Sequence, residues 1–389
     1  MVSERAKRVF SFLQADRRST FRFLESLVRA ESPSQIPESQ TAVLQLMTDE
    51  LEDLGFRVRK IAGTKTGGHL LATPHRRARG GPVQVMLGHC DTVWPVGTIE
   101  TMPVTIRSGR MTGPGIYDMK AGLALMIGAI RALRECRLEP AVTPVVFINS
   151  DEEIGSHESK PILARLAKTA NRVFVLEPSM GPEGKLKTLR KGVGQFTIRV
   201  RGKAAHAGLE PEAGASAILE LSRIVQRLFA LNDPDRGITV NVGTIDGGVR
   251  PNVVAPESSA VADVRVMSME QARAIEETIH GLQPETPRTK IEVEGGVRTP
   301  PLERTPRNRM LWEVAREVGR ELGLELEECL AGGGSDGNLT SLYAPTLDGL
   351  GAVGGGAHAA HEFIEMDRLI ERGALLTLLL ASPPLELRT

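Results

Sequence analysis

The sequence has few cysteines, no excess of charge of one sign and no long apolar run. Its only cysteines are Cys90, Cys136 and Cys329, a sparse and odd set that excludes a disulfide scaffold and fits a reducing compartment. Basic and acidic residues number 48 each, so the basic footprint of a nucleic-acid-binding protein is missing. The longest apolar run, 121–132, is too short to span a bilayer, and the charged segment 1–20 does not resemble a signal peptide. We therefore expect a soluble cytoplasmic protein without a nucleic-acid or membrane partner.

What is present is an ordinary globular composition, long enough for two or three domains. Hydrophobic residues make up 41% and charged residues 25% of the 389 positions. Apolar residues recur at helical spacing in 20–29 and 41–54, whereas 82–88, 142–150 and 172–177 are short apolar runs typical of buried strands. Alternation of such strands with helices predicts an α/β sheet that is covered by helices on its faces.

The pattern changes near residue 190, where half-exposed strands replace buried ones. The elements that follow have the order β-α-β-β-α-β, which predicts a ferredoxin-like α+β unit. We expect this unit to span 190–297 and to interrupt a first domain composed of 1–189 and 298–389. Its expected strands are 195–201, 238–245, 258–266 and 290–294, and its expected helices are 213–231 and 269–282.

Polar side chains follow the predicted strands of the first domain at the edge where α/β sheets place their sites. His89 and Asp91 are two residues apart, so they face the same way in an extended chain, and the carboxylate can aim the imidazole at a metal. Cys90 between them points away, so we interpret it as a buried spacer. Asp118 follows a Gly-Pro-Gly loop where a helix to about Arg137 begins, and taken alone this position favours a simple helix N-cap.

A second group consists of Asp151, Glu152 and Glu153, directly after a predicted strand. Adjacent carboxylates repel one another, and a divalent metal neutralises them, although a solvated acidic turn is the alternative. Glu152 and Glu153 point to different sides, so one can bind a metal while the other acts as a general base. Glu177 closes the next strand. Near the C-terminus, His358 and His361 follow a run of glycines and are both candidate ligands.

Together these residues resemble the motifs of the dinuclear zinc exopeptidases and deacylases. That family includes glutamate carboxypeptidase, acetylornithine deacetylase, succinyl-diaminopimelate desuccinylase and aminoacylase. The resemblance covers almost the whole chain and keeps the family's motif order: H-x-D at His89, D-M-K at Asp118, D-E-E at 151–153, E-P at Glu177 and the late histidine at His358. It implies two divalent metal ions, zinc or else cobalt or manganese, in a zinc-peptidase-like mixed sheet.

The resemblance also implies a role for each of these positions. Glu152 would be the general base that takes a proton from the water between the two metals and passes it to the leaving amine. Asp91 would orient His89, and the peptide bond Asp118–Met119 would be cis. His358 is preferred to His361 because Glu362 follows it by four residues. The implied metal ligands are His89 and Glu177 for one ion, Glu153 and His358 for the other, and Asp118 between them.

Further residues that the family uses are implied in the inserted unit and in a late loop. His206, in the segment GKAAHAG, would stabilise the oxyanion of the tetrahedral intermediate, usually in the active site of the partner subunit of a homodimer formed through the inserted unit. The implied contacts to the substrate carboxylate are Asn252, Arg265, Gly333 and Gly334.

The resulting prediction is a zinc-dependent exopeptidase that hydrolyses the amide bond to a C-terminal glutamate or similar free-carboxylate amino acid. The segments KTLRKGVGQF, GKAAHAG and GGGSDGN are most similar to the glutamate carboxypeptidase branch. The alternative is an N-acyl-amino-acid deacylase of the acetylornithine deacetylase or aminoacylase type. A binding protein that kept the fold and lost catalysis is a third interpretation.

Overall fold

The computed structural model describes residues 2–76 and 80–386, and the chain divides into two compact units. The first unit contains residues up to 188, 304–330 and the segment from 335 onward. The second contains Leu189–Glu303 together with Ala331–Gly334. The long inserted segment therefore ends later than the expected 297. Residues 331–334, which contain Gly333 and Gly334 and are called the late glycine loop below, join the second unit instead of the first.

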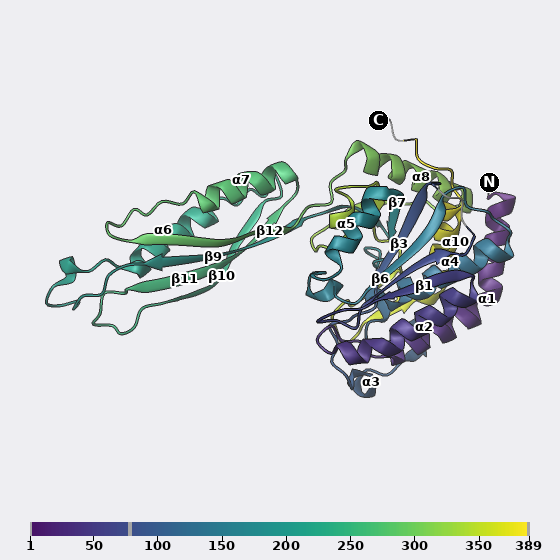
Figure 1. Ribbon diagram of the computed structural model, residues 1–389, viewed down its shortest axis with the longest axis horizontal. Coiled ribbons are helices and arrows are strands. Elements are labelled where there is room, and N and C mark those ends of the chain that lie inside the picture. The colour runs from purple at the N-terminus through teal and green to yellow at the C-terminus, as the bar shows by residue number, and fades with distance from the viewer. Residues whose placement is uncertain (1, 77–79, 387–389) are drawn as a thin grey trace. The chain divides into compact units, whose positions relative to one another are not determined.

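A six-stranded mixed sheet forms the centre of the first unit (Figure 1). β3 is parallel to both of its neighbours, β6 and β7, and β14 is parallel to β7, whereas β1 and β2 are added antiparallel at the other edge. This arrangement confirms the predicted mixed α/β fold. In sheet order the strands are β1 (Phe56–Ile61), β2 (His69–Pro74), β6 (Thr143–Asn149), β3 (Val83–His89), β7 (Ala170–Val175) and β14 (Thr346–Leu347).

Helices cover both faces of this sheet, which explains why its strands are continuous apolar runs. Met86 on β3 packs into the core with α1 and α4, while its neighbours Val85 and Leu87 face the other side, toward Leu163 of α5. The helices of this unit are α1 (Glu4–Arg29), α2 (Gln40–Asp53), α3 (Thr98–Thr101), α4 (Ala121–Glu135), α5 (Lys160–Thr169), α8 (Pro306–Leu322), α9 (Asp336–Thr340) and α10 (Met366–Leu380).

A smaller four-stranded sheet brings together two segments that are far apart in sequence. Its order is β15 (Gly354–Gly355), β16 (Phe363–Glu365), β5 (Arg110–Thr112) and β4 (Thr105–Arg107). In this sheet Phe363 lies opposite Thr112, so the loop before β16 and the loop after β5 emerge side by side. Two further strands, β8 (Leu186–Arg190) and β13 (Glu328–Ala331), form a pair of their own.

The second unit is a four-stranded antiparallel sheet with two helices. The sheet order β10-β11-β9-β12 and the chain order β-α-β-β-α-β are those of a ferredoxin-like unit, as predicted. Phe196, Ile198 and Val200 alternate along β9 toward a core shared with both helices. The elements are β9 (Gly192–Arg201), α6 (Ala217–Phe229), β10 (Thr239–Gly247), β11 (Glu257–Val266), α7 (Met269–His280) and β12 (Lys290–Thr299).

Among residues 2–76 and 80–386, no helix combines the length and the apolar character that a bilayer crossing requires.

Candidate metal centre

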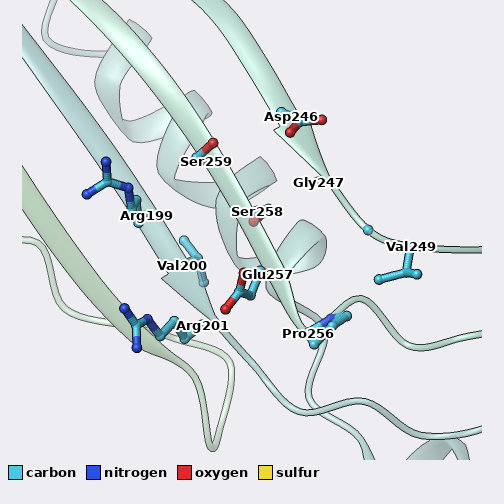
Figure 2. Close-up of a pocket in the computed structure, with 11 residues that line it drawn as sticks. Arg199, Val200, Arg201, Asp246, Gly247, Val249, Pro256, Glu257, Ser258 and Ser259 are labelled. Atoms are coloured by element: carbon cyan, nitrogen blue, oxygen red, sulfur yellow. The ribbon is translucent and has the colours of Figure 1, made fainter.

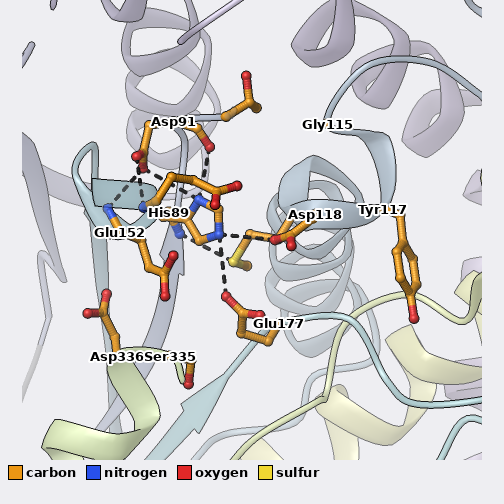
Figure 3. Close-up of polar contacts among 12 residues, drawn as sticks. His89, Asp91, Gly115, Tyr117, Asp118, Glu152, Glu177, Ser335 and Asp336 are labelled. Atoms are coloured by element: carbon orange, nitrogen blue, oxygen red, sulfur yellow. Dashed lines mark hydrogen bonds and ion pairs between the residues drawn. The ribbon is translucent and has the colours of Figure 1, made fainter. Parts of the chain in front are cut away.

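Three neighbouring parallel strands end at the same edge of the large sheet, and polar residues follow each of them. β3 ends at His89, and β6 ends just before Asp151, Glu152 and Glu153. β7 ends at Val175, so Glu177 lies two residues beyond the strand rather than at its last position. Since β3 lies between β6 and β7, His89 sits between the two acidic groups (Figure 3).

His89 is buried and is held by carboxylates on both of its ring nitrogens. Nδ1 lies 3.0 Å from the Asp91 carbonyl oxygen and 3.5 Å from Asp91 Oδ1. Nε2 lies 3.2 Å from Asp118 Oδ1 and 3.3 Å from Glu177 Oε1. Burial lowers the pKa of His89, but its bonds to Asp118, Asp91 and Glu177 outweigh burial and raise the pKa well above its usual value. Nε2 therefore faces the carboxylates that share the centre.

Asp91 contacts the acidic segment at Glu152 and Glu153 as well as the imidazole of His89. Its carboxylate accepts hydrogen bonds from Ser34 Oγ at 2.7 Å and from the backbone N–H groups of Glu152 and Glu153 at 3.2 and 3.1 Å. The side chain that lies beside His89 therefore also holds the backbone of the acidic segment in place.

Asp118 contacts both histidines of the centre with different oxygens. While Oδ1 faces His89, Oδ2 lies 3.5 Å from His358 Nε2, which in turn lies 3.3 Å from Glu153 Oε2. Bonds to Asp118 and Glu153 raise the pKa of His358 to about 10. His361 is exposed, and the structure records none of these contacts for it among the described residues.

The helix after the Gly-Pro-Gly loop begins later than predicted. α4 starts at Ala121, and Asp118 lies in the irregular turn η2 (Ile116–Lys120) with φ −116° and ψ 98°, which is not helical. Asp118 is therefore not a helix N-cap. The peptide bond Asp118–Met119 is cis, as expected from the resemblance.

Glu152 and Glu153 belong to different clusters, as their opposite directions predict. One cluster is His89, Glu152 and Glu177, and the other is His89, Asp118 and Glu153; within each, one potential ligand atom per residue lies within 4.8 Å of the others. Burial raises the pKa of Glu152 well above its usual value, and the nearby charges of Glu177 and Asp336 add to the effect.

The residues present fit a divalent metal ion. Glu153 Oε1 is buried without a hydrogen-bond partner, which is costly for a carboxylate oxygen unless a cation binds it. Imidazole nitrogens combined with carboxylate oxygens are the donor set of zinc and related transition metals.

Metal binding at this centre should depend on pH. In the metal-free protein the raised pKa of His358, about 10, keeps its imidazole protonated at lower pH. A metal must displace that proton to bind. Because the pKa of His89 is raised as well, we expect affinity to rise by at least roughly tenfold per pH unit below pH 10, for one or more protons displaced. Titration calorimetry in buffers of different ionisation enthalpy measures the released protons, and a pH-independent affinity with no proton release would contradict this expectation.

All the residues expected to contact the substrate lie in the second unit. His206 is exposed, and its Nδ1 accepts hydrogen bonds from the N–H groups of Gly208 and Leu209 at 3.1 and 3.2 Å, so Nε2 is the nitrogen left to carry a proton. The N–H of Ala207 donates to the Asn252 carbonyl oxygen at 3.0 Å, which places His206 beside Asn252.

Arg265 and the two glycines are held by other partners. The guanidinium of Arg265 binds the Asp263 carboxylate through two bonds of 2.8 and 3.0 Å. The carbonyl oxygens of Gly333 and Gly334 accept from Arg190 Nη1 at 3.1 and 2.9 Å. Whether these residues and His206 reach the metal cluster stays a prediction.

A hollow of about 310 Å³ in the second unit contains arginines but offers no free positive charge (Figure 2). Arg199 pairs with Glu294 at 2.8 Å and Arg201 pairs with Glu292 at 3.2 Å. Both arginines of the hollow therefore have an acidic partner.

Two buried carboxylates near the centre received no role from the sequence. Asp336 accepts hydrogen bonds from Ser156 Oγ and Asn149 Nδ2, yet burial raises its pKa to about 6. Its charge also contributes to the raised pKa of Glu152. Glu362 is fully buried beside the Asp118 loop. The sequence signal was the place of Asp336 inside the segment GGGSDGN and of Glu362 four residues after His358, but the hydrogen-bond partners of both lie more than 170 residues away.

The profile of Peptidase family M20/M25/M40 matches residues 85–382, which is more than half of the chain. The chain belongs to this family. Membership makes it a metal-dependent hydrolase of the metallopeptidase and amidohydrolase type, and it confirms the family that the motifs resemble. The candidate ligands fall inside the matched region.

Similar proteins support the same assignment to M20/M25/M40. Carboxypeptidase G2 of Pseudomonas sp. (strain RS-16) is 28% identical over 382 residues, covering 96% of this chain and 91% of that protein. Acetylornithine deacetylase of Myxococcus xanthus is 26% identical over 326 residues, covering 79% and 82%. The crystal structure of aminopeptidase PepT from Bacillus cereus ATCC 10987 superposes with a TM-score of 0.79 at 26% identity, covering 94% of this chain and 98% of that one.

Proposed function

We propose that this protein is a dinuclear zinc exopeptidase that releases a C-terminal glutamate or a similar free-carboxylate amino acid from an acyl or peptidyl group. The observation that carries the proposal is the position of Asp118, whose two oxygens face two different histidines, His89 and His358. A carboxylate so placed is suited to bridge two ions. Cobalt and manganese also suit this donor set.

The ions would be held by the residues that the structure gathers. His89 and Glu177 would hold one ion, Glu153 and His358 the other, and Asp118 both. When bound, such ions polarise the scissile carbonyl and lower the pKa of water.

Glu152 would move the proton in this reaction. It would accept a proton from water and donate it to the leaving amine. Its raised pKa suits that exchange, because a base with a pKa nearer neutrality both takes and returns a proton readily. Asp91 would keep His89 in the orientation that leaves Nε2 toward the centre.

The choice of substrate rests on similarity and on the second unit. Members of this family act on small peptides or acyl amino acids, and the carboxypeptidase G2 relative supports the carboxypeptidase branch. Arg265, Asn252 and the loop at Gly333 and Gly334 would bind the substrate carboxylate. The guanidinium of Arg265 would do so while it keeps its hydrogen bonds to Asp263. His206 would donate from Nε2 to the oxyanion.

The placement of these residues within the second unit supports a homodimer. His206 and Asn252 lie before β11, whereas Arg265 lies near its last residue, opposite Val193. A strand of this length spans roughly 25–30 Å, so one small substrate cannot touch both groups of a single copy. A second copy would supply His206 and Asn252 to the first.

We expect charge on the free edge of this unit to produce a monomer. β10 is an edge strand, and Ile245 on it is 63% exposed. Ile218 on α6 is 46% exposed. The double substitution Ile218→Glu and Ile245→Asp should give a monomer in sedimentation that keeps its metal but loses most of its activity. Ile106→Glu, at a 60% exposed position of the first unit, is the control. Full activity in a verified monomer would disprove the trans role of His206.

Hydrolysis of folate, followed by absorbance with and without a chelator, tests the proposal. Chelator-sensitive release of glutamate would support it. The similarity to acetylornithine deacetylase favours N-acyl-amino-acid deacylase activity as the second candidate, so acetylated amino acids and dipeptides are the parallel substrates. Turnover of these and not of folate would move the assignment to the deacylases. Binding of these substrates with no turnover of any of them would favour an inactive binding protein.

The cytoplasmic location stays a prediction.

A further inference from the structure

Glu362 is a buried carboxylate that no step of the proposed reaction uses. Its two oxygens accept four hydrogen bonds: Oε2 from Trp94 Nε1 and from the Gly115 N–H, both at 2.9 Å, and Oε1 from the N–H groups of Tyr117 and Asp118 at 2.7 and 3.0 Å. The side chain is 0% exposed. Three of these four donors belong to the backbone of the loop that ends at Asp118.

The same residue closes the loop that carries His358. Residues 356–362 connect β15 to β16, and the N–H of Ala359 donates to Gly356 O while that of Glu362 donates to Ala359 O, both at 2.9 Å. Gly356 has a positive φ of 77°, and a Cβ there would lie 3.0 Å from the backbone of Glu362. The base of this loop is therefore tightly closed.

The small sheet places the two loops next to each other, but it ends before either ligand. Phe363 pairs with Thr112, and among the described residues this is the last pair of the two strands before Asp118 and His358. The contacts of Glu362 begin where the pairing stops.

We propose that Glu362 is a positioning residue that joins the Asp118 loop to the His358 loop and so sets the spacing of the ligands of one metal ion. This inference rests on the proposed function, because it assumes that Asp118, Glu153 and His358 bind that ion. The distances that Glu362 would set are those from His358 Nε2 to Asp118 Oδ2 and to Glu153 Oε2, 3.5 and 3.3 Å in this structure.

The chemistry of the contact favours a carboxylate at this position. An ionised carboxylate only accepts, so its oxygens can receive all four donors. The amide of a glutamine would turn an NH₂ group toward two N–H donors, and an aspartate would be one methylene too short to reach all of them. Loss of such a supporting contact typically costs about 10- to 100-fold in metal affinity.

The test compares Glu362→Gln and Glu362→Asp with wild type and with Glu365→Gln. Glu365 lies on the same hairpin, where it pairs with Arg110 at 2.7 Å, and is the matched control. Zinc affinity and ions per chain are measured by competition with a chromophoric chelator. Thermal unfolding midpoints are recorded in excess chelator and in excess zinc.

We expect E362Q to bind one of two zinc ions at least about tenfold more weakly, E362D to lose less, and E365Q to match wild type. The shift of the midpoint caused by zinc should shrink in E362Q. Unchanged affinities, with midpoints lowered equally with and without zinc, would show a purely structural role and overturn the inference. Should E362Q fail to fold, E362D decides by the same comparison. Wild type that binds no zinc would instead refute the proposed function itself.

Discussion

Glu152→Gln is expected to lower kcat by roughly 10²–10⁴-fold, the usual contribution of a general base, while leaving the bound metal in place. Glutamine keeps the size of the side chain but cannot take up a proton at neutral pH. The environment of Glu152 supports this role, because burial and the charges of Glu177 and Asp336 raise its pKa. Steady-state kinetics and metal analysis of the same preparation measure the two effects.

The geometry allows Glu152 to be either a general base or a metal ligand, and the metal analysis separates these two roles. Glu152 lies in a cluster with His89 and Glu177 whose potential ligand atoms are within 4.8 Å of one another, so it is close enough to bind an ion. Loss of an ion in E152Q would make Glu152 a ligand and contradict the proposed base. Glu135→Gln, at an exposed position on α4, should keep both activity and metal.

Asp118→Asn is expected to remove both metal ions and all measurable activity. The change replaces one carboxylate oxygen with an amide nitrogen and removes the negative charge between His89 and His358. Because the residue would bind both ions directly, the loss of affinity should exceed the roughly 10- to 100-fold typical of supporting residues. Metal content after gel filtration is the measurement.

His358→Ala is the matched comparison for Asp118→Asn. It removes a ligand of one ion only, so we expect one ion to remain bound through His89 and Glu177. A D118N protein that retains two ions, or an H358A protein that loses none, would disprove the assigned bridging arrangement.

The sequence predicted the sheet and the edge where polar residues gather well, because both depend on local patterns. The apolar runs of β3, β6 and β7 follow from burial on both faces, and parallel strands bring their ends to one edge. That edge gathers His89, Glu152 and Glu177, which lie 63 and 25 residues apart in the chain. No contact had to be known in advance for this prediction.

What the sequence could not predict depends on contacts between distant segments. The first helix extends from Glu4, not 20, since Ala6 and Val9 bury one face of a segment whose charges hide the pattern. α4 begins at Ala121, after a loop whose backbone N–H groups donate to Glu362, a residue more than 240 positions from Asp118.

The late glycine loop illustrates the same limit. Its sequence places Gly333 and Gly334 within the final segment of the first domain. The structure assigns them to the second unit, where Arg190 binds both carbonyl oxygens across 143 and 144 residues. A bond of that range leaves no trace in the local pattern.

Titration of the metal-free protein with zinc, while hydrolysis of its amide substrate and bound zinc are followed together, tests the central claim most directly. The account predicts no hydrolysis in excess chelator and full hydrolysis only when two zinc ions are bound per chain. Undiminished hydrolysis in excess chelator, or full activity with a single ion, would contradict it.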